Sequence, residues 1–257
     1  MFRPRVIPVL LLNKDFLVKS KNFKNYTYIG DPINAVRLFN EFRADELVFL
    51  DIAASKSKRT ISYSLIKDIA EEAMMPFSVG GGITELTQIR EIISLGVEKV
   101  IIGSYAVHNP AFIRDAANEF GSSTISVCID VKKNLFGKEQ VWTLNGSKPS
   151  GITPIQFAQL MQENGAGEII LQSVERDGKM NGYDLNLIKK VSESIGIPTV
   201  ALGGAGNLSH LREAYFNAGA NALAAGSLFV YYGPNNGVLI NYPQKTDLSF
   251  YYENSSI

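Results

Sequence analysis

Residues 46–52 have the sequence ELVFLDI, and residues 167–173 have the sequence GEIILQS. Both runs are apolar at their centres without alternation, which is typical of strands covered on both faces, as in a parallel sheet. Similar runs occur at 5–12, 76–81, 99–104, 124–130, 198–204 and 222–227. Amphipathic segments between the runs predict helices at 31–42, 62–73, 85–96, 109–120, 153–165, 186–196 and 207–219. Eight such units predict an α/β protein with one closed (β/α)8 barrel, a TIM barrel.

The two halves of the chain resemble each other. ELVFLDI at 46 is answered 122 residues later by EIILQSV. VGGGI at 79 is answered 123 residues later by LGGAG, and the Gly-Ser pair at 103 recurs at the same offset. A repeat of half the barrel predicts approximate twofold symmetry, with equivalent loops facing each other across one mouth. We expect residues 1–233 to form the barrel and residues 234–257, which lack helical periodicity, to form a C-terminal appendage.

Composition excludes several classes of function. The 257 residues include 25 basic and 25 acidic side chains, so no surface field for nucleic acid or anionic lipid is indicated. No apolar stretch approaches the ~18 residues of a spanning helix, and the N-terminal run lacks the features of a secretory signal. The lone Cys128 cannot form an internal disulfide. His108 and His210 show no metal-ligand spacing. We therefore expect a cytoplasmic protein without a metal, a cofactor, or a nucleic-acid or membrane partner.

Glycine and serine gather where four of the expected strands end. The clusters are Gly80-Gly81-Gly82, Gly103-Ser104, Gly203-Gly204-Ala205-Gly206 and Gly226-Ser227. In such a barrel the active site lies at these carboxyl ends. Glycine lets backbone N–H groups approach a phosphate, and serine hydroxyls and helix N-termini complete the cradle; the alternative is that glycine serves the turns alone. The two symmetric pairs of clusters favour two opposed phosphate sites, suited to a ligand with a phosphate at each end.

Ionisable side chains are expected at the same mouth. Asp130 ends the fifth strand and is a candidate general acid or base, with capping of the next loop as the alternative role. Its symmetry partner on the first strand is Leu11, so a pair of carboxylates is absent. Asp51 and Asp177 also reach the mouth. Lys19, in the first loop, is either a contact to an anion or an ordinary solvated lysine.

The opposite ends of the strands contribute a ring of alternating charges. Its members are Arg5, Glu46, Lys99 and Glu168. One interpretation is a plug of mutually satisfied ion pairs. The other is a gate, whose side chains part to admit a small polar molecule along the barrel axis.

From about Arg5 to Phe229 the chain resembles the cyclase subunit of imidazole glycerol phosphate synthase, the barrel partner of a glutaminase in histidine biosynthesis. Segments that support the resemblance include RVIP (5–8), ADELVFLDI (44–52), PFSVGGGI (76–83) and GGAGN (203–207). The resemblance implies a ribulose-containing substrate with two phosphates, and ammonia that enters from a glutaminase docked at the bottom face. It implies that the charged ring is the ammonia gate and that Asp130 is one of two catalytic aspartates. It also implies phosphate contacts at Gly82, Ser104, Asp177, Gly178, Gly204 and Ser227.

Departures from the family pattern gather at the mouth, whereas the gate residues are retained. Leu11, within the sequence VLLL, stands where the family has its other catalytic aspartate. Gly103-Ser104 replaces an Asn-Thr pair, Leu202 replaces a serine, Gln172 replaces a small hydroxyl residue, and Ser20 replaces a glycine of the first loop. Loss of a proton-transfer partner typically lowers a rate by ~10²–10⁴-fold.

The LLL sequence at 10–12 and the C-terminal LINYP (239–243) are similar to those of a second clade of the family. That clade is associated with a glutaminase-like partner and a sugar amidotransferase in surface-polysaccharide biosynthesis. The resemblance predicts an ammonia conduit in such a complex. The first alternative is an active cyclase of histidine biosynthesis, whose chemistry depends on Asp130 alone or on a substitute for the missing aspartate such as Asp51. The second is a non-catalytic scaffold that binds a phosphorylated ligand.

Overall fold

The computed structural model describes residues 3–249 and 251, and its centre is a closed ring of eight parallel strands. In spatial order the strands are β1 (Arg5–Asn13), β4 (Leu47–Asp51), β5 (Phe77–Gly80), β6 (Lys99–Ile102), β7 (Ile125–Lys133), β10 (Glu168–Ser173), β11 (Thr199–Leu202) and β12 (Ala222–Ala225). The ring closes because β12 pairs with β1 and β10 pairs with β7. The predicted barrel is confirmed.

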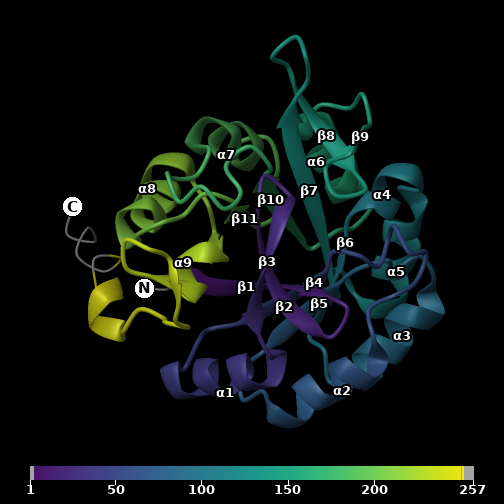
Figure 1. Cartoon of the computed structure of the whole chain (residues 1–257). Coiled ribbons are helices and arrows are strands. Elements are labelled where there is room, and N and C mark those ends of the chain that lie inside the picture. Colours follow the sequence, from purple (N-terminus) through teal and green to yellow (C-terminus); the bar gives the residue numbers. More distant parts are fainter. Residues whose placement is uncertain (1–2, 250, 252–257) are drawn as a thin grey trace.

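Helices surround this ring (Figure 1). The long ones are α1 (Pro32–Phe42), α2 (Tyr63–Glu72), α3 (Leu86–Ser94), α5 (Ala111–Phe120), α6 (Pro154–Glu163), α7 (Leu185–Ser192) and α8 (Leu208–Ala218). Each lies within or close to the segment predicted for it. Two short helices were not predicted, α4 (Ser104–His108) and α9 (Ser227–Val230). Because each begins at a serine predicted to bind phosphate, backbone N–H groups without helical partners lie beside that hydroxyl.

Two hairpins cross the mouth of the barrel. The first follows β1 and consists of β2 (Phe16–Lys21) and β3 (Lys24–Gly30). The second extends β7 through β8 (Glu139–Thr143) and β9 (Lys148–Pro149). They occupy equivalent places in the two halves, because β1 and β7 are four strands apart in either direction around the ring. Neither hairpin was predicted from the sequence; in the first, β3 is largely exposed and has no apolar pattern.

Apolar side chains form an inner and an outer core. The outer core lies between the strands and the helices, and includes Phe39, Phe49 and Phe157. The inner core, which we name the lumen cluster, consists of Ile7, Val9, Val48, Ile101, Ile170, Val200, Leu202, Ala222 and Ala224. Leu11, Leu50 and Cys128 pack against it and are partly buried. The axis of the barrel is therefore apolar.

The described part of the C-terminal appendage packs onto the barrel. After the short strands β13 (Tyr231–Tyr232) and β14 (Gly237–Val238), the chain forms a 3₁₀ turn, η2 (Lys245–Leu248). Tyr242, Leu248 and Tyr251 are buried, and the ring of Tyr242 contacts those of Phe39 and Phe229. The rest of the predicted appendage, residues 250 and 252–257, lies outside the described residues. Among residues 3–249 and 251, no helix combines the length and apolarity needed to span a bilayer.

Candidate functional site

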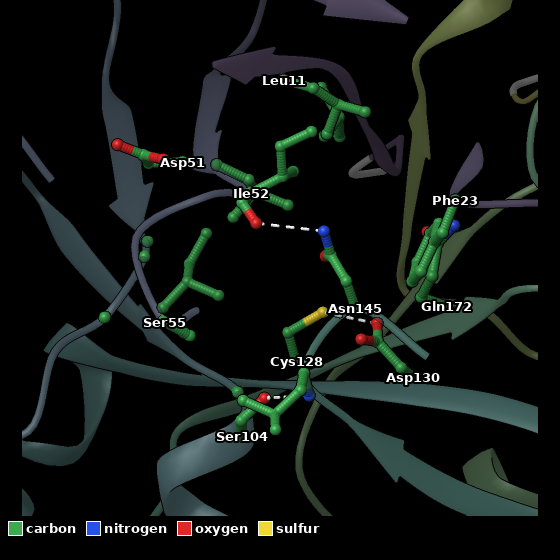
Figure 2. Close-up of a pocket in the computed structure, with 18 of the residues that line it drawn as sticks. Leu11, Phe23, Asp51, Ile52, Ser55, Ser104, Cys128, Asp130, Asn145 and Gln172 are labelled. Atoms are coloured by element: carbon green, nitrogen blue, oxygen red, sulfur yellow. Dashed lines mark hydrogen bonds between the residues drawn. The ribbon is translucent and has the colours of Figure 1, made fainter. Parts of the chain in front are cut away.

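The carboxyl ends of the barrel strands border one pocket of about 440 Å³. Apolar side chains line its lower part, among them Val9, Leu11, Leu50, Ile101 and Leu202. The residues predicted for catalysis or for substrate and phosphate contacts, with Leu11, line this pocket: Leu11, Lys19, Asp51, Gly82, Ser104, Asp130, Asp177, Gly178, Gly204 and Ser227. Figure 2 shows several of them around the cavity. The structure therefore brings the predicted residues together, while their roles remain predictions.

Asp130 on β7 borders the pocket opposite Leu11 on β1 (Figure 2). The thiol of Cys128 donates to its carboxylate over 3.9 Å, a long hydrogen bond. Burial, and to a smaller extent the charge of Asp177, raise the pKa of Asp130 to about 7 against the opposing effect of the thiol contact. A carboxyl group with this pKa exchanges protons readily near neutral pH. Leu11 can take no part in such an exchange.

Asp177, in the loop after β10, holds the first hairpin over the mouth. Ser20 Oγ donates to its Oδ2 at 2.8 Å, and the backbone N–H of Phe23 donates to the same atom at 3.4 Å. The backbone N–H of Asn22 donates to the carbonyl of Asp177 at 3.0 Å. Burial raises the pKa of this carboxyl group, and the hydrogen bond from Ser20 opposes the rise. In this geometry Asp177 is an anchor for the hairpin.

Lys19 is a buried cation at the mouth, only 5% exposed. Its Nζ donates to the carbonyl of Val9 at 2.7 Å. A Cβ added to Gly226 would lie 2.0 Å from Nζ, so the ammonium group occupies the space left by that glycine. Burial lowers the pKa of Lys19 to about 8, although Asp177 opposes the change. The interpretation as a solvated lysine is wrong, and a positive charge lies beside the predicted phosphate site at Ser227.

The second hairpin covers the predicted phosphate site after β6. Ser104 Oγ accepts a hydrogen bond from the backbone N–H of Leu144 at 2.9 Å. Asn145 Nδ2 donates to the carbonyl of Ile52 at 3.0 Å and contacts Tyr26 Oη at 3.4 Å (Figure 2 shows the first). The two hairpins therefore meet above the pocket. Leu144 and Asn145 were missed, since no motif marks them; the symmetry of the two halves was the available signal.

Asp51 is fully occupied by its own loop. It accepts from the N–H groups of Ala53 and Ala54 at 3.0 and 3.1 Å. Both terminal nitrogens of Arg59 donate to its carboxylate, at 2.6 and 3.2 Å. The same loop lies tightly over Gly82, where an added Cβ would be 1.8 Å from the Arg59 carbonyl oxygen. Arg59 and two lysines, Lys56 and Lys58, give this side of the pocket a positive lining that suits an anionic ligand.

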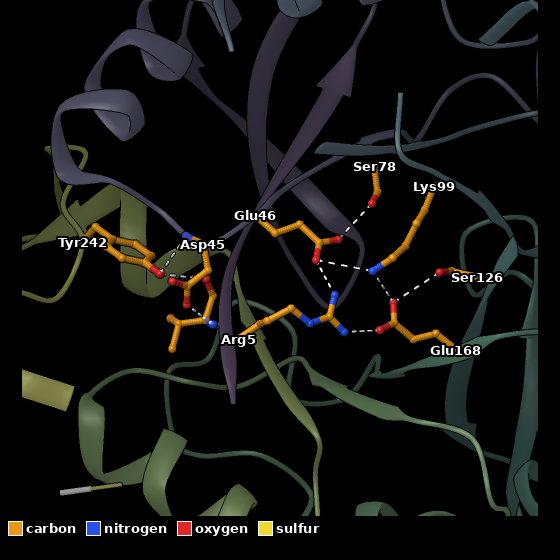
Figure 3. Close-up of polar contacts among 9 residues, drawn as sticks. Arg5, Asp45, Glu46, Ser78, Lys99, Ser126, Glu168 and Tyr242 are labelled. Atoms are coloured by element: carbon orange, nitrogen blue, oxygen red, sulfur yellow. Dashed lines mark hydrogen bonds and ion pairs between the residues drawn. The ribbon is translucent and has the colours of Figure 1, made fainter. Parts of the chain in front are cut away.

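The four predicted gate residues form one ion-pair network, which we name the floor network (Figure 3). Arg5 bridges Glu46 and Glu168 through its two terminal nitrogens. Lys99 Nζ lies 3.5 Å from Glu46 Oε2 and 3.6 Å from Glu168 Oε1. Ser78 donates to Glu46 Oε1 at 2.9 Å, and Ser126 donates to Glu168 Oε1, the oxygen that faces Lys99, at 3.2 Å. The network lies at the amino-terminal ends of the strands, below the apolar lumen, and its role as a gate or a plug stays a prediction.

The two histidines lie on different helices, α4 and α8. His108 borders the pocket, and His210 accepts a hydrogen bond from the backbone N–H of Gly206 at 3.1 Å. Within residues 3–249 and 251, no three metal-ligating side chains come together.

Fold and site together define a (β/α)8 barrel with a charged floor, an apolar lumen and a glycine-lined mouth. Residues 5–235 match the family model described as "Histidine biosynthesis protein". The chain is 47% identical over 248 residues to "Putative imidazole glycerol phosphate synthase subunit HisF" of Leptospira interrogans. The matched region covers 96% of this chain and 98% of the relative. A Pseudomonas aeruginosa relative, "Putative imidazole glycerol phosphate synthase subunit hisF2", is 43% identical over 248 residues, 96% of this chain and 99% of its own.

A third relative, "Imidazole glycerol phosphate synthase subunit HisF" of Alkaliphilus metalliredigens, is 40% identical over 231 residues, 90% of this chain and 92% of the relative. The chain therefore belongs to the HisF-like family of imidazole glycerol phosphate synthase cyclase subunits. The family resemblance deduced from the motifs is confirmed.

Proposed function

We propose that the chain is the barrel subunit of a glutamine-dependent amidotransferase complex and conducts ammonia rather than cyclizing a substrate. In this proposal a glutaminase docks beneath the floor network, and a sugar amidotransferase of surface-polysaccharide biosynthesis receives ammonia at the mouth. The observation that supports it most directly is the pairing of an aliphatic Leu11 opposite Asp130 with a complete floor network.

The environment of the other carboxylates argues against a simple replacement of the missing aspartate. Asp51 is bound by Arg59 and two backbone N–H groups. Asp177 accepts hydrogen bonds from the hairpin that it anchors. Each carboxylate is thus committed to a structural contact, Asp51 to its own loop and Asp177 to the first hairpin, and taking over the role of the missing aspartate would cost those hydrogen bonds.

The lumen suits the passage of a small neutral molecule. Ion pairs close the bottom, and aliphatic side chains such as Ile7, Val48 and Ile170 follow above. Bringing a cation into such a lumen without a partner costs far more than bringing in a neutral amine. The barrel therefore favours ammonia over ammonium between the floor network and the mouth.

Active cyclization is the second candidate, and Lys19 is the observation that favours it. This residue lies beside Val9 on the Leu11 side of the pocket, and its pKa of about 8 allows it to give or take a proton near neutral pH. A general acid at this place would partly restore the missing function.

The test is an assay of the purified chain with the bisphosphorylated ribulose substrate of the cyclase and an ammonium salt, which needs no partner. A cyclase subunit of histidine biosynthesis, assayed alongside, provides the positive control. We expect no turnover above the background rate. Robust turnover would overturn the conduit proposal, and its loss in Lys19→Met would assign the proton transfer to that lysine.

A further inference from the structure

Gln172 on β10 has a buried hydrogen-bond acceptor without a donor. The residue is 4% exposed and lines the pocket, where Figure 2 shows its side chain behind the ring of Phe23. Its Nε2 donates to Asp177 Oδ1 at 3.4 Å. Its Oε1 has no partner among the described residues. A buried carbonyl oxygen left in this state costs free energy, so the site calls for a donor that this chain does not supply.

Asp130 is the neighbour of Gln172 across the sheet. The two residues are register partners on the adjacent parallel strands β7 and β10. Adjacent strands lie about 4.8 Å apart, so the two side chains border the same small volume of the pocket. Among the described residues, the carboxylate receives one contact, the 3.9 Å hydrogen bond from Cys128. Two acceptors therefore border this volume, one without a donor and the other with a single weak donor among the described residues.

The position of Gln172 and Asp130 along the barrel axis limits which kinds of ligand could donate hydrogen bonds to them. Two positions earlier on the same strands are Ile170, a member of the lumen cluster, and Cys128, which packs against it. Gln172 and Asp130 are thus the first polar side chains above the apolar lumen on strands β7 and β10. A phosphate offers only acceptors to them and is repelled by the carboxylate. A small molecule with several N–H donors fits.

We propose that Gln172 and Asp130 form a binding site for ammonia and ammonium at the upper end of the lumen. The proposal rests on the proposed function, because the lumen must deliver ammonia to this point. An N–H of the bound molecule donates to Gln172 Oε1 and another donates to the Asp130 carboxyl group. The pKa of about 7 lets that group accept a hydrogen bond as a carboxylate or give its proton to arriving ammonia, which leaves ammonium beside a carboxylate.

The test uses the side-chain amide signals of Gln172 in ¹H–¹⁵N NMR spectra of the full chain. Ammonium chloride is titrated in, and sodium and tetramethylammonium chloride of the same ionic strength serve as cations without N–H donors. We expect saturable shifts of the Gln172 signals with ammonium alone. Equal shifts with sodium or tetramethylammonium, or none with ammonium, would overturn the site.

Substitutions of Gln172 and Asp130 test whether these two side chains bind the ammonium ion. Shifts of backbone signals around the pocket report binding where the Gln172 amide is absent. Gln172→Leu and Asp130→Asn should each weaken ammonium binding about tenfold, the scale of one hydrogen bond to an ion. Gln159→Leu, the same change on the exposed face of α6, should leave it unchanged. Unchanged affinity in Gln172→Leu would show that the orphan oxygen holds water only, and would overturn the proposal.

The ammonium-site proposal and the conduit proposal can be disproved independently. The titration needs no glutaminase, so a negative result removes the ammonium site and leaves the conduit intact. Conversely, gate variants that keep glutamine hydrolysis coupled to ammonia use would remove the conduit, while the Gln172-dependent titration would still stand.

Discussion

Leu11 and Asp130 project into the same pocket from diametrically opposite strands of the barrel, β1 and β7 (Figure 2). The two positions are equivalent under the symmetry of the two half-barrels, yet one is aliphatic and the other is an acid whose pKa is raised to about 7. The mouth can therefore exchange a proton on one side of a ligand. On the opposite side, the hairpin that follows β1 supplies a buried lysine, Lys19.

Replacing Leu11 with aspartate tests whether this asymmetry explains the expected lack of cyclization. We expect Leu11→Asp to raise ammonium-dependent cyclization at least ~10²-fold, because a positioned acid or base contributes about this much. The rate of product formation from the bisphosphorylated substrate is the measurement. Leu11→Asn has nearly the same shape but cannot transfer a proton. If both variants remain at the background rate, the lack of cyclization does not come from Leu11. The next feature to test is then the predicted phosphate site at Ser104, which Leu144 covers.

The buried carboxyl group of Asp130 should make stability depend on pH. Its pKa is higher in the folded protein than the ordinary value of 3.8, so the folded state binds the extra proton between about pH 4 and pH 7. Stability from this group is present below pH 4 and is lost as the pH rises through 7. The free energy of unfolding of Asp130→Asn should therefore increase relative to that of the parent as the pH rises. The upper limit of this change is about 4 kcal/mol, and water in the pocket makes the actual change smaller.

Urea unfolding at pH 4.5 and pH 8 measures this difference. Asp68→Asn, on the exposed face of α2, is the matched control. A difference between parent and Asp130→Asn that stays constant between the two pH values would show that the folded protein does not perturb the acid.

The floor network gives a prediction about coupling. Lys99→Met removes one of the two cations that hold Glu46 and Glu168 together, with Arg5 remaining. In the complex with its glutaminase we expect glutamine hydrolysis to continue while transfer of its nitrogen to the acceptor falls several-fold, because the closed network no longer seals the lumen. The ratio of acceptor aminated to glutamate formed is the measurement. Lys190→Met, on the outer face of α7, is the control, and an unchanged ratio in Lys99→Met would indicate a structural plug.

The barrel was predictable because its strands are buried on both faces and its helices on one. Those two burial patterns leave periodicities that the sequence displays, as in ELVFLDI (46–52) and in the apolar face of α1 (Pro32–Phe42). The mouth residues followed from the rule that strand ends meet at one face. The pairing of Arg5 with Glu168, 163 positions apart, needed only the closure of the ring.

The contacts within the mouth were not predictable in this way. Lys19 lies on a hairpin with no apolar period, so nothing in the sequence showed that its ammonium group turns inward to the Val9 carbonyl. The engagement of Asp51 by Arg59 depends on the path of an irregular loop. Gln172 was recognised as a departure from the family pattern, but its unpartnered oxygen appears only when the surrounding side chains are in place. Such features depend on tertiary packing, which local sequence patterns do not encode.

Tyr242 joins the C-terminal segment to the strand that supplies Arg5. Its hydroxyl group donates to the carbonyl of Val6 at 2.9 Å and accepts from the backbone N–H of Asp45 at 3.2 Å (Figure 3). Val6 and Asp45 each adjoin a member of the floor network. Tyr242→Phe keeps the ring against Phe39 but leaves a buried carbonyl and an N–H without this partner.

We expect Tyr242→Phe to lower the free energy of unfolding by about 1–3 kcal/mol, the cost of leaving buried polar groups unsatisfied. Urea unfolding of the full chain measures it. Tyr232→Phe is the matched control, because Tyr232 is 68% exposed and should change stability by less than about 0.5 kcal/mol. Equal effects of the two substitutions would mean that the tail is held by its aromatic packing alone. A loss confined to Tyr242→Phe, together with a lower ratio of acceptor aminated to glutamate formed, would show that the C-terminal segment also positions the floor network.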